Sequence, residues 1–176
     1  HGATLKGRTG FPKKVGTLGD MSCFSFYFGH HMTTIEGGMI STDNEEIYQL
    51  ARMFRSHGMT REASKEVQEK YASPDLNPLF TFAVPGYNMR STEINGFLGL
   101  LQLERLDYNI EQRSKNLNIW IEHLDSNKYF TDYLMEGSSN YALPLIIKDV
   151  KNKVKMKDVC MVLEDNRVEY RIGTAG

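Results

Sequence analysis

The sequence predicts an α/β layer fold, because strand-like and helix-like patterns alternate along the chain. The aromatic run at residues 23–28 is typical of a buried strand, and residues 39–42 predict a second short strand. Asp43 and Glu46 have the spacing of a capping box, which predicts the start of a helix. The apolar residues that follow fall on one face of that helix: Ile47, Leu50, Ala51 and Phe54.

A second helical region follows a stretch with little periodicity. Residues 61–85 contain three prolines and predict a long irregular excursion, a kind of segment that is often functional. Residues 91–125 contain no proline and predict one long helix or two helices in near-continuation. Gly96 and Gly99 lower the helix propensity there, so we expect both to pack closely against another element.

The two ends of the chain differ in residue composition and in the secondary structure that they predict. Residues 1–20 are rich in glycine and predict turns and short connections. Beyond Asn127 the patterns predict a strand at 141–147, a helix around 156–163 and the start of a strand at 168–172.

The change in residue composition and periodicity after the long helical region predicts a domain boundary near residue 126. We expect residues 1–125 to form part of a large α/β domain and residues 126–176 to begin a smaller α+β domain. The chain starts at His1 without a methionine and stops in a strand-to-loop passage, so both ends are expected to be cuts and the chain a fragment.

Composition narrows the class of protein. The chain has 176 residues, 40% hydrophobic and 24% charged, which is typical of a soluble globular protein. Its formal net charge of −1 argues against a nucleic-acid or membrane partner, and no apolar run approaches the roughly 18 residues of a membrane span. Cys23 and Cys160 lie far apart, which argues against a disulfide framework and favours the reducing cytoplasm.

Polar residues gather between the two predicted strands. His30, His31, Thr33 and Glu36 precede a glycine pair, and Ser25 stands at the end of the first strand. Hydroxyls and glycines beside a strand end suit a phosphate, because backbone N–H groups can approach its oxygens. Taken alone, the pattern fits better an ordinary strand–turn–strand with surface histidines.

A metal site is a remote alternative for the same residues. Imidazole and carboxylate groups are common metal ligands, and His30, His31, His57 and Glu36 supply both. Adjacent histidines on an extended segment point to opposite sides, which disfavours this alternative.

Several short motifs occur in a fixed order. They are H-G-A at 1–3, K-G-R at 6–8, G-T-L-G-D at 16–20, F-S-F at 24–26, T-T-I-E-G-G-M at 33–39, R-S-H-G at 55–58, G-Y-N-M-R at 86–90, G-L-L-Q-L at 99–103 and L-D at 106–107. Together they resemble the DegT-type sugar aminotransferase family, strongly from residue 1 to about 115 and weakly beyond.

The resemblance implies the fold-type I architecture of pyridoxal-phosphate enzymes, like that of aspartate aminotransferase. It also implies a homodimer with a shared active site. Ser25 is then expected on the cofactor phosphate, His57 near the cofactor, and Asn88 and Arg90 in the site of the neighbouring subunit. The family's aspartate that pairs with the pyridine nitrogen would precede His1.

His30 stands where the usual family member has the lysine that binds the cofactor covalently. Imidazole cannot form a Schiff base, so the pyridoxal or pyridoxamine phosphate is expected to be held non-covalently. A base that titrates near neutrality remains, which suits proton transfer. The resemblance therefore implies that His30 is the catalytic base.

This substitution resembles the family's 3-dehydratases, which remove the C3 hydroxyl of nucleotide-linked 4-keto-6-deoxy sugars and use glutamate to restore the amine form of the cofactor. One kind carries an iron–sulfur cluster, which takes about four cysteine ligands, whereas this chain has two cysteines. The cluster-free kind is favoured, with GDP-4-keto-6-deoxymannose as the substrate in colitose synthesis.

Alternative interpretations remain for the whole chain and for single residues. The chain fits a nucleotide-sugar aminotransferase or an inactive relative of one. His31 and Glu36 are expected to shape the loop, and His57 also suits the C-terminal end of a helix dipole. Asn88 fits a turn, and Arg90 fits an ion pair with a nearby glutamate at a helix start.

Overall fold

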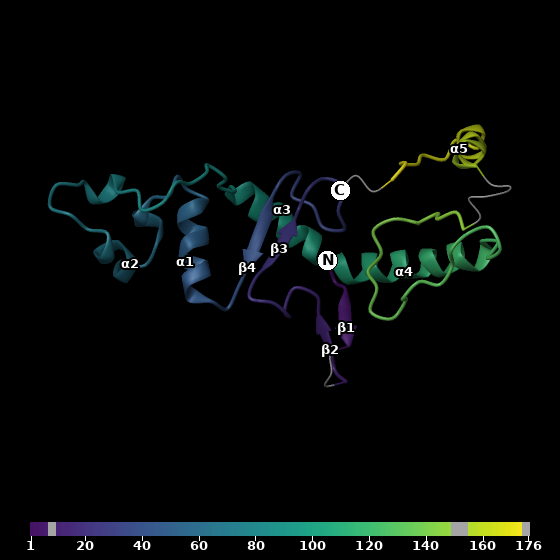
Figure 1. Ribbon diagram of the computed structural model, residues 1–176, viewed down its shortest axis with the longest axis horizontal. Coiled ribbons are helices and arrows are strands. Elements are labelled where there is room, and N and C mark those ends of the chain that lie inside the picture. The colour runs from purple at the N-terminus through teal and green to yellow at the C-terminus, as the bar shows by residue number, and fades with distance from the viewer. Residues whose placement is uncertain (7–9, 149–154, 174–176) are drawn as a thin grey trace.

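The computed structural model describes residues 1–6, 10–148 and 155–173. Helices and strands follow one another along an elongated molecule, with two small antiparallel sheets near its middle (Figure 1). The K-G-R motif at residues 6–8 and the chain end at residues 172–176 lie partly outside the described residues. The predicted order of strand, loop, strand and helix is present at residues 22–54, whereas all described strands precede the helices, so the alternation does not continue along the described chain.

The glycine-rich N-terminal region forms a β-hairpin. Strand β1 (Thr4–Lys6) pairs antiparallel with β2 (Pro12–Lys14), and Thr4 lies opposite Lys14. Turns and short connections were expected here, so this expectation was incomplete. The sequence signal is weak because each strand has only three residues.

The two strands predicted around the histidine loop are present. Strand β3 (Ser22–Ser25) pairs antiparallel with β4 (Gly38–Ser41), with Ser25 opposite Gly38. The first strand ends three residues earlier than its predicted end at Phe28. Tyr27 and Phe28 are exposed in the loop, because the chain turns away directly after Phe26.

Helix α1 (Glu45–Phe54) begins one residue later than the predicted capping box implies. The N-cap is Asn44, whose Oδ1 accepts hydrogen bonds from the N–H groups of Glu46 at 2.9 Å and Ile47 at 3.2 Å. Asp43 is therefore not the cap. An asparagine amide oxygen satisfies the free N–H groups of a first turn as well as an aspartate does.

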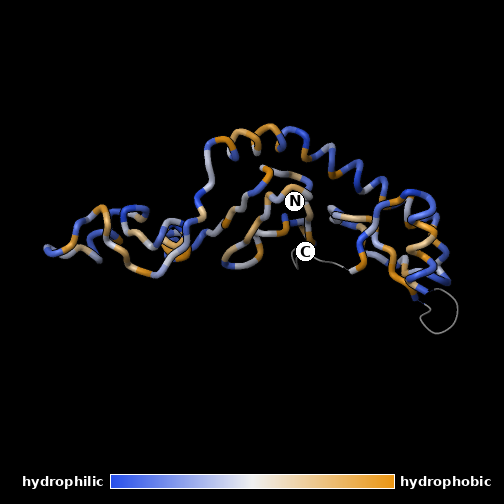
Figure 2. Tube along the Cα trace, turned by 90° about the horizontal axis from the view of Figure 1, so that it is seen from above, coloured by the Kyte–Doolittle hydropathy of each residue, from blue (hydrophilic) through white to orange (hydrophobic). Residues whose placement is uncertain are grey.

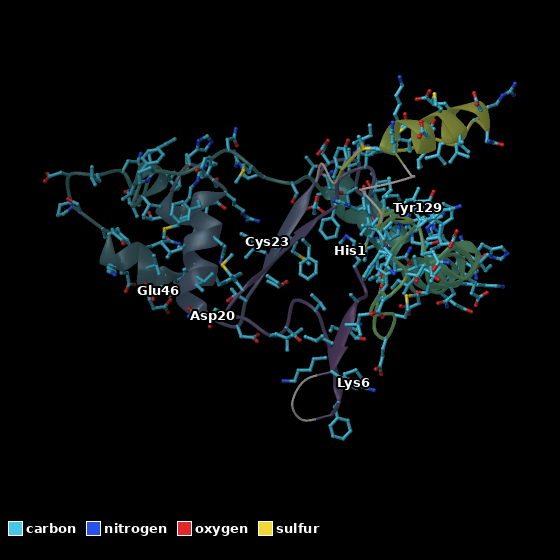
Figure 3. All side chains as sticks on the ribbon, turned by 45° about the vertical axis from the view of Figure 1, so that its right-hand side comes forward. His1, Lys6, Asp20, Cys23, Glu46 and Tyr129 are labelled. Atoms are coloured by element: carbon cyan, nitrogen blue, oxygen red, sulfur yellow. The ribbon has the colours of Figure 1, made fainter. Side chains whose placement is uncertain are left out.

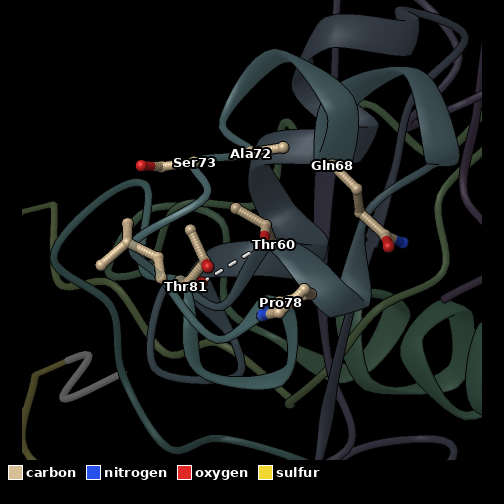
Figure 4. A pocket seen from close by; sticks show the side chains of 7 residues that line it. Thr60, Gln68, Ala72, Ser73, Pro78 and Thr81 are labelled. Carbon is tan, nitrogen blue, oxygen red and sulfur yellow. Dashed lines mark hydrogen bonds between the residues drawn. The ribbon is translucent and has the colours of Figure 1, made fainter.

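The predicted excursion of residues 61–85 contains short helices. They are η1 (Thr60–Glu62), α2 (Lys65–Lys70) and η2 (Pro78–Phe80). Thr60 Oγ1 donates to the Thr81 carbonyl at 3.3 Å beside a cavity of about 50 Å³, drawn in Figure 4. The cavity is of a size for water rather than for a sugar nucleotide.

The long helical region is two helices, α3 (Glu93–Leu103) and α4 (Leu106–His123), as one of the two predicted arrangements has it. Gly99 is buried, and a Cβ there would lie 3.5 Å from Thr34 Cγ2, so its predicted close packing is confirmed. The same prediction is wrong for Gly96, which faces open space.

Beyond α4 the chain is irregular as far as residue 148. The predicted strand at 141–147 is absent from the described residues, and only an isolated bridge joins Tyr129 to Ile147. The Trp120 indole N–H instead donates to the Pro144 carbonyl at 3.0 Å. The predicted helix is present as α5 (Met156–Asp165), whereas the described part of 168–172 is not a strand.

Apolar side chains of α3 lie uncovered by the rest of the described chain. Ile94 is 70% exposed, Phe97 62% and Leu100 66%. Figure 2 shows apolar residues in the left part of the upper helical rod, whereas the rod further right is mostly hydrophilic. None of the helices in residues 1–6, 10–148 and 155–173 has the length and apolar character to cross a bilayer.

We expect replacement of glycine by alanine to have opposite effects on the free energy of unfolding at Gly58 and Gly96. Gly58 is buried with φ +79°, and a Cβ there would overlap the Val84 carbonyl oxygen. We expect Gly58→Ala to lower the free energy of unfolding by more than about 2 kcal/mol, from left-handed strain plus the overlap. Gly96→Ala is expected to raise it by about 0.5–1 kcal/mol through helix propensity. Urea unfolding measures both, and equal effects would contradict the packing described.

Candidate functional site

The loop of residues 26–37 is closed at its base by backbone hydrogen bonds. The Phe26 N–H donates to the Gly37 carbonyl at 2.8 Å, and the Thr34 N–H donates to the Phe26 carbonyl at 3.0 Å. The Thr33 hydroxyl donates to the same Phe26 carbonyl at 3.1 Å. A Cβ on Gly37 would overlap the Thr34 hydroxyl, so the motif needs glycine at this point.

Asn95, in the first turn of α3, anchors the far side of this loop. Its Nδ2 donates to the carbonyls of Thr34 and Glu36, each at 3.1 Å. Its Oδ1 accepts from the backbone N–H of Thr92 at 2.9 Å and so completes the capping box of the helix. Sequence reasoning missed this residue, although T-x-x-N before an apolar run is a cap signal.

The loop holds one residue in an unfavourable backbone conformation. Ile35 has φ +75°, where a β-branched residue costs roughly 1–2 kcal/mol. Its N–H donates to the Thr33 hydroxyl at 3.0 Å, and the carbonyl groups of Thr34 and Glu36 on either side of it are held by Asn95. Glu36 helps to fix the loop, as expected, but through its carbonyl oxygen.

Ser25 lies at the end of β3 with an exposed side chain. Its Oγ accepts from the Tyr27 N–H at 3.4 Å, and its carbonyl meets His1 Nε2 at 3.0 Å. The His1 ring stacks on Phe26 at a centroid distance of 5.3 Å, and Figure 3 shows His1 beside the sheet that carries Cys23. The Ser25 hydroxyl hydrogen is free to donate to a phosphate oxygen.

His30 is half-buried and framed by aromatic rings. The rings of His1, Tyr27 and Tyr141 meet it edge-on at centroid distances of 6.4, 6.0 and 5.6 Å. Within the part of the chain that the structure describes, no hydrogen bond engages the His30 imidazole. Both ring nitrogens are thus available for proton transfer.

His31 faces inward and is 7% exposed. Its Nε2 lies 2.7 Å from the Asn140 carbonyl, and a neutral ring with the proton on Nε2 donates this hydrogen bond. Burial lowers the pKa of His31 below its ordinary value, and the nearby positive charge of Arg113 lowers it further, whereas the bond to Asn140 raises it. The bond to Asn140 ties the histidine loop to the chain beyond α4.

His57 and Asn88 lie together in a second group. Ser56 and Asn88 form an isolated antiparallel bridge, and the His57 N–H donates to the Tyr87 carbonyl at 2.6 Å. His57 has φ +61°, a left-handed conformation three residues after the last residue of α1. The R-S-H-G and G-Y-N-M-R motifs are therefore neighbours in space.

The structure does not join the two groups within this chain. Asn88 and Arg90 are exposed, and none of the hydrogen bonds among the described residues links them or His57 to Ser25 or His30. A metal centre is not supported either. In residues 1–6, 10–148 and 155–173, no three His, Cys, Asp or Glu side chains are grouped to hold a metal ion.

Comparison with known proteins defines the class. Residues 1–173 match the DegT/DnrJ/EryC1/StrS aminotransferase family. The GDP-4-keto-6-deoxy-D-mannose 3-dehydratase of Yersinia pseudotuberculosis is 38% identical over 84% of this chain and 37% of that protein. The UDP-4-amino-4,6-dideoxy-N-acetyl-beta-L-altrosamine transaminase of Campylobacter jejuni (serotype O:2) is 32% identical over 77% of this chain and 33% of its own length.

Solved structures agree on the fold. The Escherichia coli GDP-4-keto-6-deoxy-D-mannose-3-dehydratase with bound hydrated PLP has a TM-score of 0.76 at 35% identity, covering 89% of this chain and 41% of that chain. The Psychrobacter cryohalolentis aminotransferase, at 23% identity, has a TM-score of 0.70 over 94% of this chain and 43% of its own, and shows the fold alone.

The fold is therefore that of the pyridoxal-phosphate-dependent aminotransferases, as predicted. The chain belongs to the DegT/DnrJ/EryC1/StrS aminotransferase family, which confirms the resemblance seen in the motifs. It spans 37% of the length of the Yersinia relative.

The buried His31 predicts a loss of stability in mild acid. Above the ordinary histidine pKa of 6.5, both the folded and the unfolded chain hold His31 neutral. Below it, the unfolded chain gains a proton that the folded chain, with its lower pKa, does not, so the free energy of unfolding falls as pH falls.

This effect is measured by urea unfolding at about pH 7.5 and about pH 5.5, on either side of the ordinary histidine value. His31→Gln keeps a donor for the Asn140 carbonyl but does not titrate. We expect the wild type to lose more stability than His31→Gln between the two pH values. Equal losses would show that His31 is not buried in its neutral form.

Proposed function

We propose that the protein removes the C3 hydroxyl of a nucleotide-linked 4-keto-6-deoxyhexose, GDP-4-keto-6-deoxymannose, with pyridoxal or pyridoxamine phosphate as cofactor. The observation that carries this proposal is His30. It occupies the family's lysine position on a fixed loop, with an imidazole that no described residue engages by a hydrogen bond. The names of relatives from Yersinia and Escherichia coli support the same reaction.

The residues present fit the cofactor. Ser25 offers a free hydroxyl at a strand end for the phosphate, and His30 leaves the cofactor without a covalent link. His57 is proposed to lie near the cofactor. When bound, the cofactor supplies an amine for the 4-keto group and an electron sink beside it, and glutamate is the proposed donor that restores the amine.

His30 is proposed to move the proton. One imidazole nitrogen accepts a proton from the carbon that becomes electron-rich, and the imidazolium then donates it to the hydroxyl that leaves C3 as water. The aromatic frame of His1, Tyr27 and Tyr141 restrains the ring during both transfers. Cys23 and Cys160 are free and are too few to hold an iron–sulfur cluster, so the proposed reaction is cluster-free.

We also propose the domain organisation and the location. Residues 1–125 are assigned to the large domain and 126–176 to the start of the small domain, supported by the end of α4 at His123 and the irregular chain beyond it. The reaction is placed in the cytoplasm, where free cysteines persist. Its product would serve colitose synthesis, and neither nucleic acid nor membrane is a proposed partner.

The central test uses His30→Asn. The purified protein is incubated with pyridoxal phosphate, glutamate and GDP-4-keto-6-deoxymannose, while ammonia release is followed and the sugar is identified by mass. The wild type is expected to give ammonia and the 4-keto-3,6-dideoxy sugar. His30→Asn is expected to be at least about a hundredfold slower, because a general base typically contributes a rate factor of that size.

A matched control is His123→Asn, at an exposed histidine on α4, which should keep the wild-type rate. A 4-amino sugar as the wild-type product would establish the aminotransferase alternative. If the wild type formed neither product, the chain would belong to an inactive relative.

We propose that the protein is a homodimer in which Asn88 and Arg90 enter the site of the neighbouring subunit. Both are exposed and immediately precede α3, whose apolar side chains are uncovered in the described chain. Mixing inactive His30→Asn with inactive Arg90→Ala should restore part of the activity, because a mixed dimer has one site with both native residues. No recovery after proven subunit exchange would place Arg90 in the site of its own chain.

A further inference from the structure

Of the three rings around His30, those of His1 and Tyr141 come from outside the loop, and Tyr141 lies farther from it in sequence. Tyr27 belongs to the same loop and moves with it, whereas Tyr141 comes from the irregular chain beyond α4. Its ring meets the His30 ring at 5.6 Å and 62°, an edge-to-face contact. Through this contact, the orientation of the His30 ring depends on a segment that is far from the histidine loop in sequence.

The chain segment that carries Tyr141, residues 136–141, is tied to the N-terminal part of the molecule. Glu136 forms an ion pair with Lys6 of β1, and the Gly137 carbonyl accepts from the Thr4 N–H at 2.8 Å. The Ser139 hydroxyl donates to the His1 carbonyl at 2.6 Å. These bonds run along one side of β1 and end beside the histidine loop.

Two more bonds fix the end of the segment. His31 is bound to the Asn140 carbonyl at 2.7 Å, and Arg113 Nη1 of α4 donates to the Tyr141 carbonyl at 3.0 Å. The Tyr141 backbone is thus held between the loop and α4.

The Tyr141 side chain also lies over the residue before His30. A Cβ on Gly29 would be 3.2 Å from the Tyr141 hydroxyl oxygen, so the ring spans the backbone at Gly29 and the imidazole of His30. Because Tyr141 is 54% exposed, this contact does not serve mainly to bury apolar area.

We propose that Tyr141 is a positioning residue for the reaction: its ring, held through residues 136–141, keeps the His30 imidazole in the orientation that proton transfer needs. This inference builds on the proposed function of His30. It assigns residues 136–141 a role in the active site, although they lie beyond the proposed domain boundary. Loss of the ring leaves His30 in place but free to rotate, which lowers turnover more than substrate binding.

The test combines kinetics with the chemical reactivity of His30. Tyr141→Leu removes the ring, and Tyr141→Phe keeps it. In the purified protein, kcat is expected to fall about tenfold for Tyr141→Leu with KM nearly unchanged, and to stay near the wild-type value for Tyr141→Phe. Carbethoxylation of His30 by diethyl pyrocarbonate, mapped by mass spectrometry, should be severalfold faster in Tyr141→Leu alone.

His123 provides the internal reference for reactivity, and Tyr108→Leu, at an exposed tyrosine of α4, is the matched control for both readouts. Arg113→Met keeps Tyr141 but removes the donor to its carbonyl, and should raise the reactivity of His30 even if Tyr141→Leu does not fold. Unchanged His30 reactivity in both variants, or an equal rise at His123, would overturn the proposal.

The reactivity measurement needs no substrate, so it separates the two proposals. If His30→Asn keeps the dehydration activity while Tyr141→Leu still frees His30, the function proposed for His30 fails and the positioning contact stands. If His30→Asn is inactive while Tyr141→Leu leaves kcat and His30 reactivity unchanged, the positioning role fails alone.

Discussion

The histidine loop depends on the side-chain amide of Asn95. Its Nδ2 donates to the carbonyls of Thr34 and Glu36, and its Oδ1 accepts from the backbone N–H of Thr92, the N-cap of α3, so one residue joins the loop to the start of the helix behind it. This explains how Ile35 is kept at φ +75°, a conformation that a β-branched residue adopts only when its neighbours determine it. Gly99, one turn further along α3, leaves room for Thr34 to pack against the helix.

This fixed loop carries His30, whose imidazole makes no hydrogen bond to the described residues. The His30 ring is oriented by aromatic edges, which restrain rotation but leave both nitrogens available. Its neighbour His31 has the opposite environment, since it is buried and engaged by the Asn140 carbonyl. The two adjacent histidines thus differ in burial and in their hydrogen bonding to the described residues.

Some parts of the fold were readable from sequence because their determinants are local. The strand pair around the loop, the apolar face of α1 and the proline-free helical region all follow from residue spacing. The N-cap of α1 is Asn44 and not the predicted Asp43, because both side chains suit that role and only the backbone geometry selects one of them. The strand expected at 141–147 did not form because α4 binds the carbonyls of Tyr141 and Pro144, and antiparallel pairing with residues 128–130 is confined to the end of the segment.

The sequence by itself determined the family and the strand pair around the histidine loop, since ordered motifs and local spacing need no coordinates. Tertiary structure alone decided that Asn95 anchors the loop, that His57 and Asn88 are neighbours, and that Tyr141 meets His30. These contacts join residues far apart in the chain. Their pairing depends on how loops and helices pack in space, which local spacing does not encode.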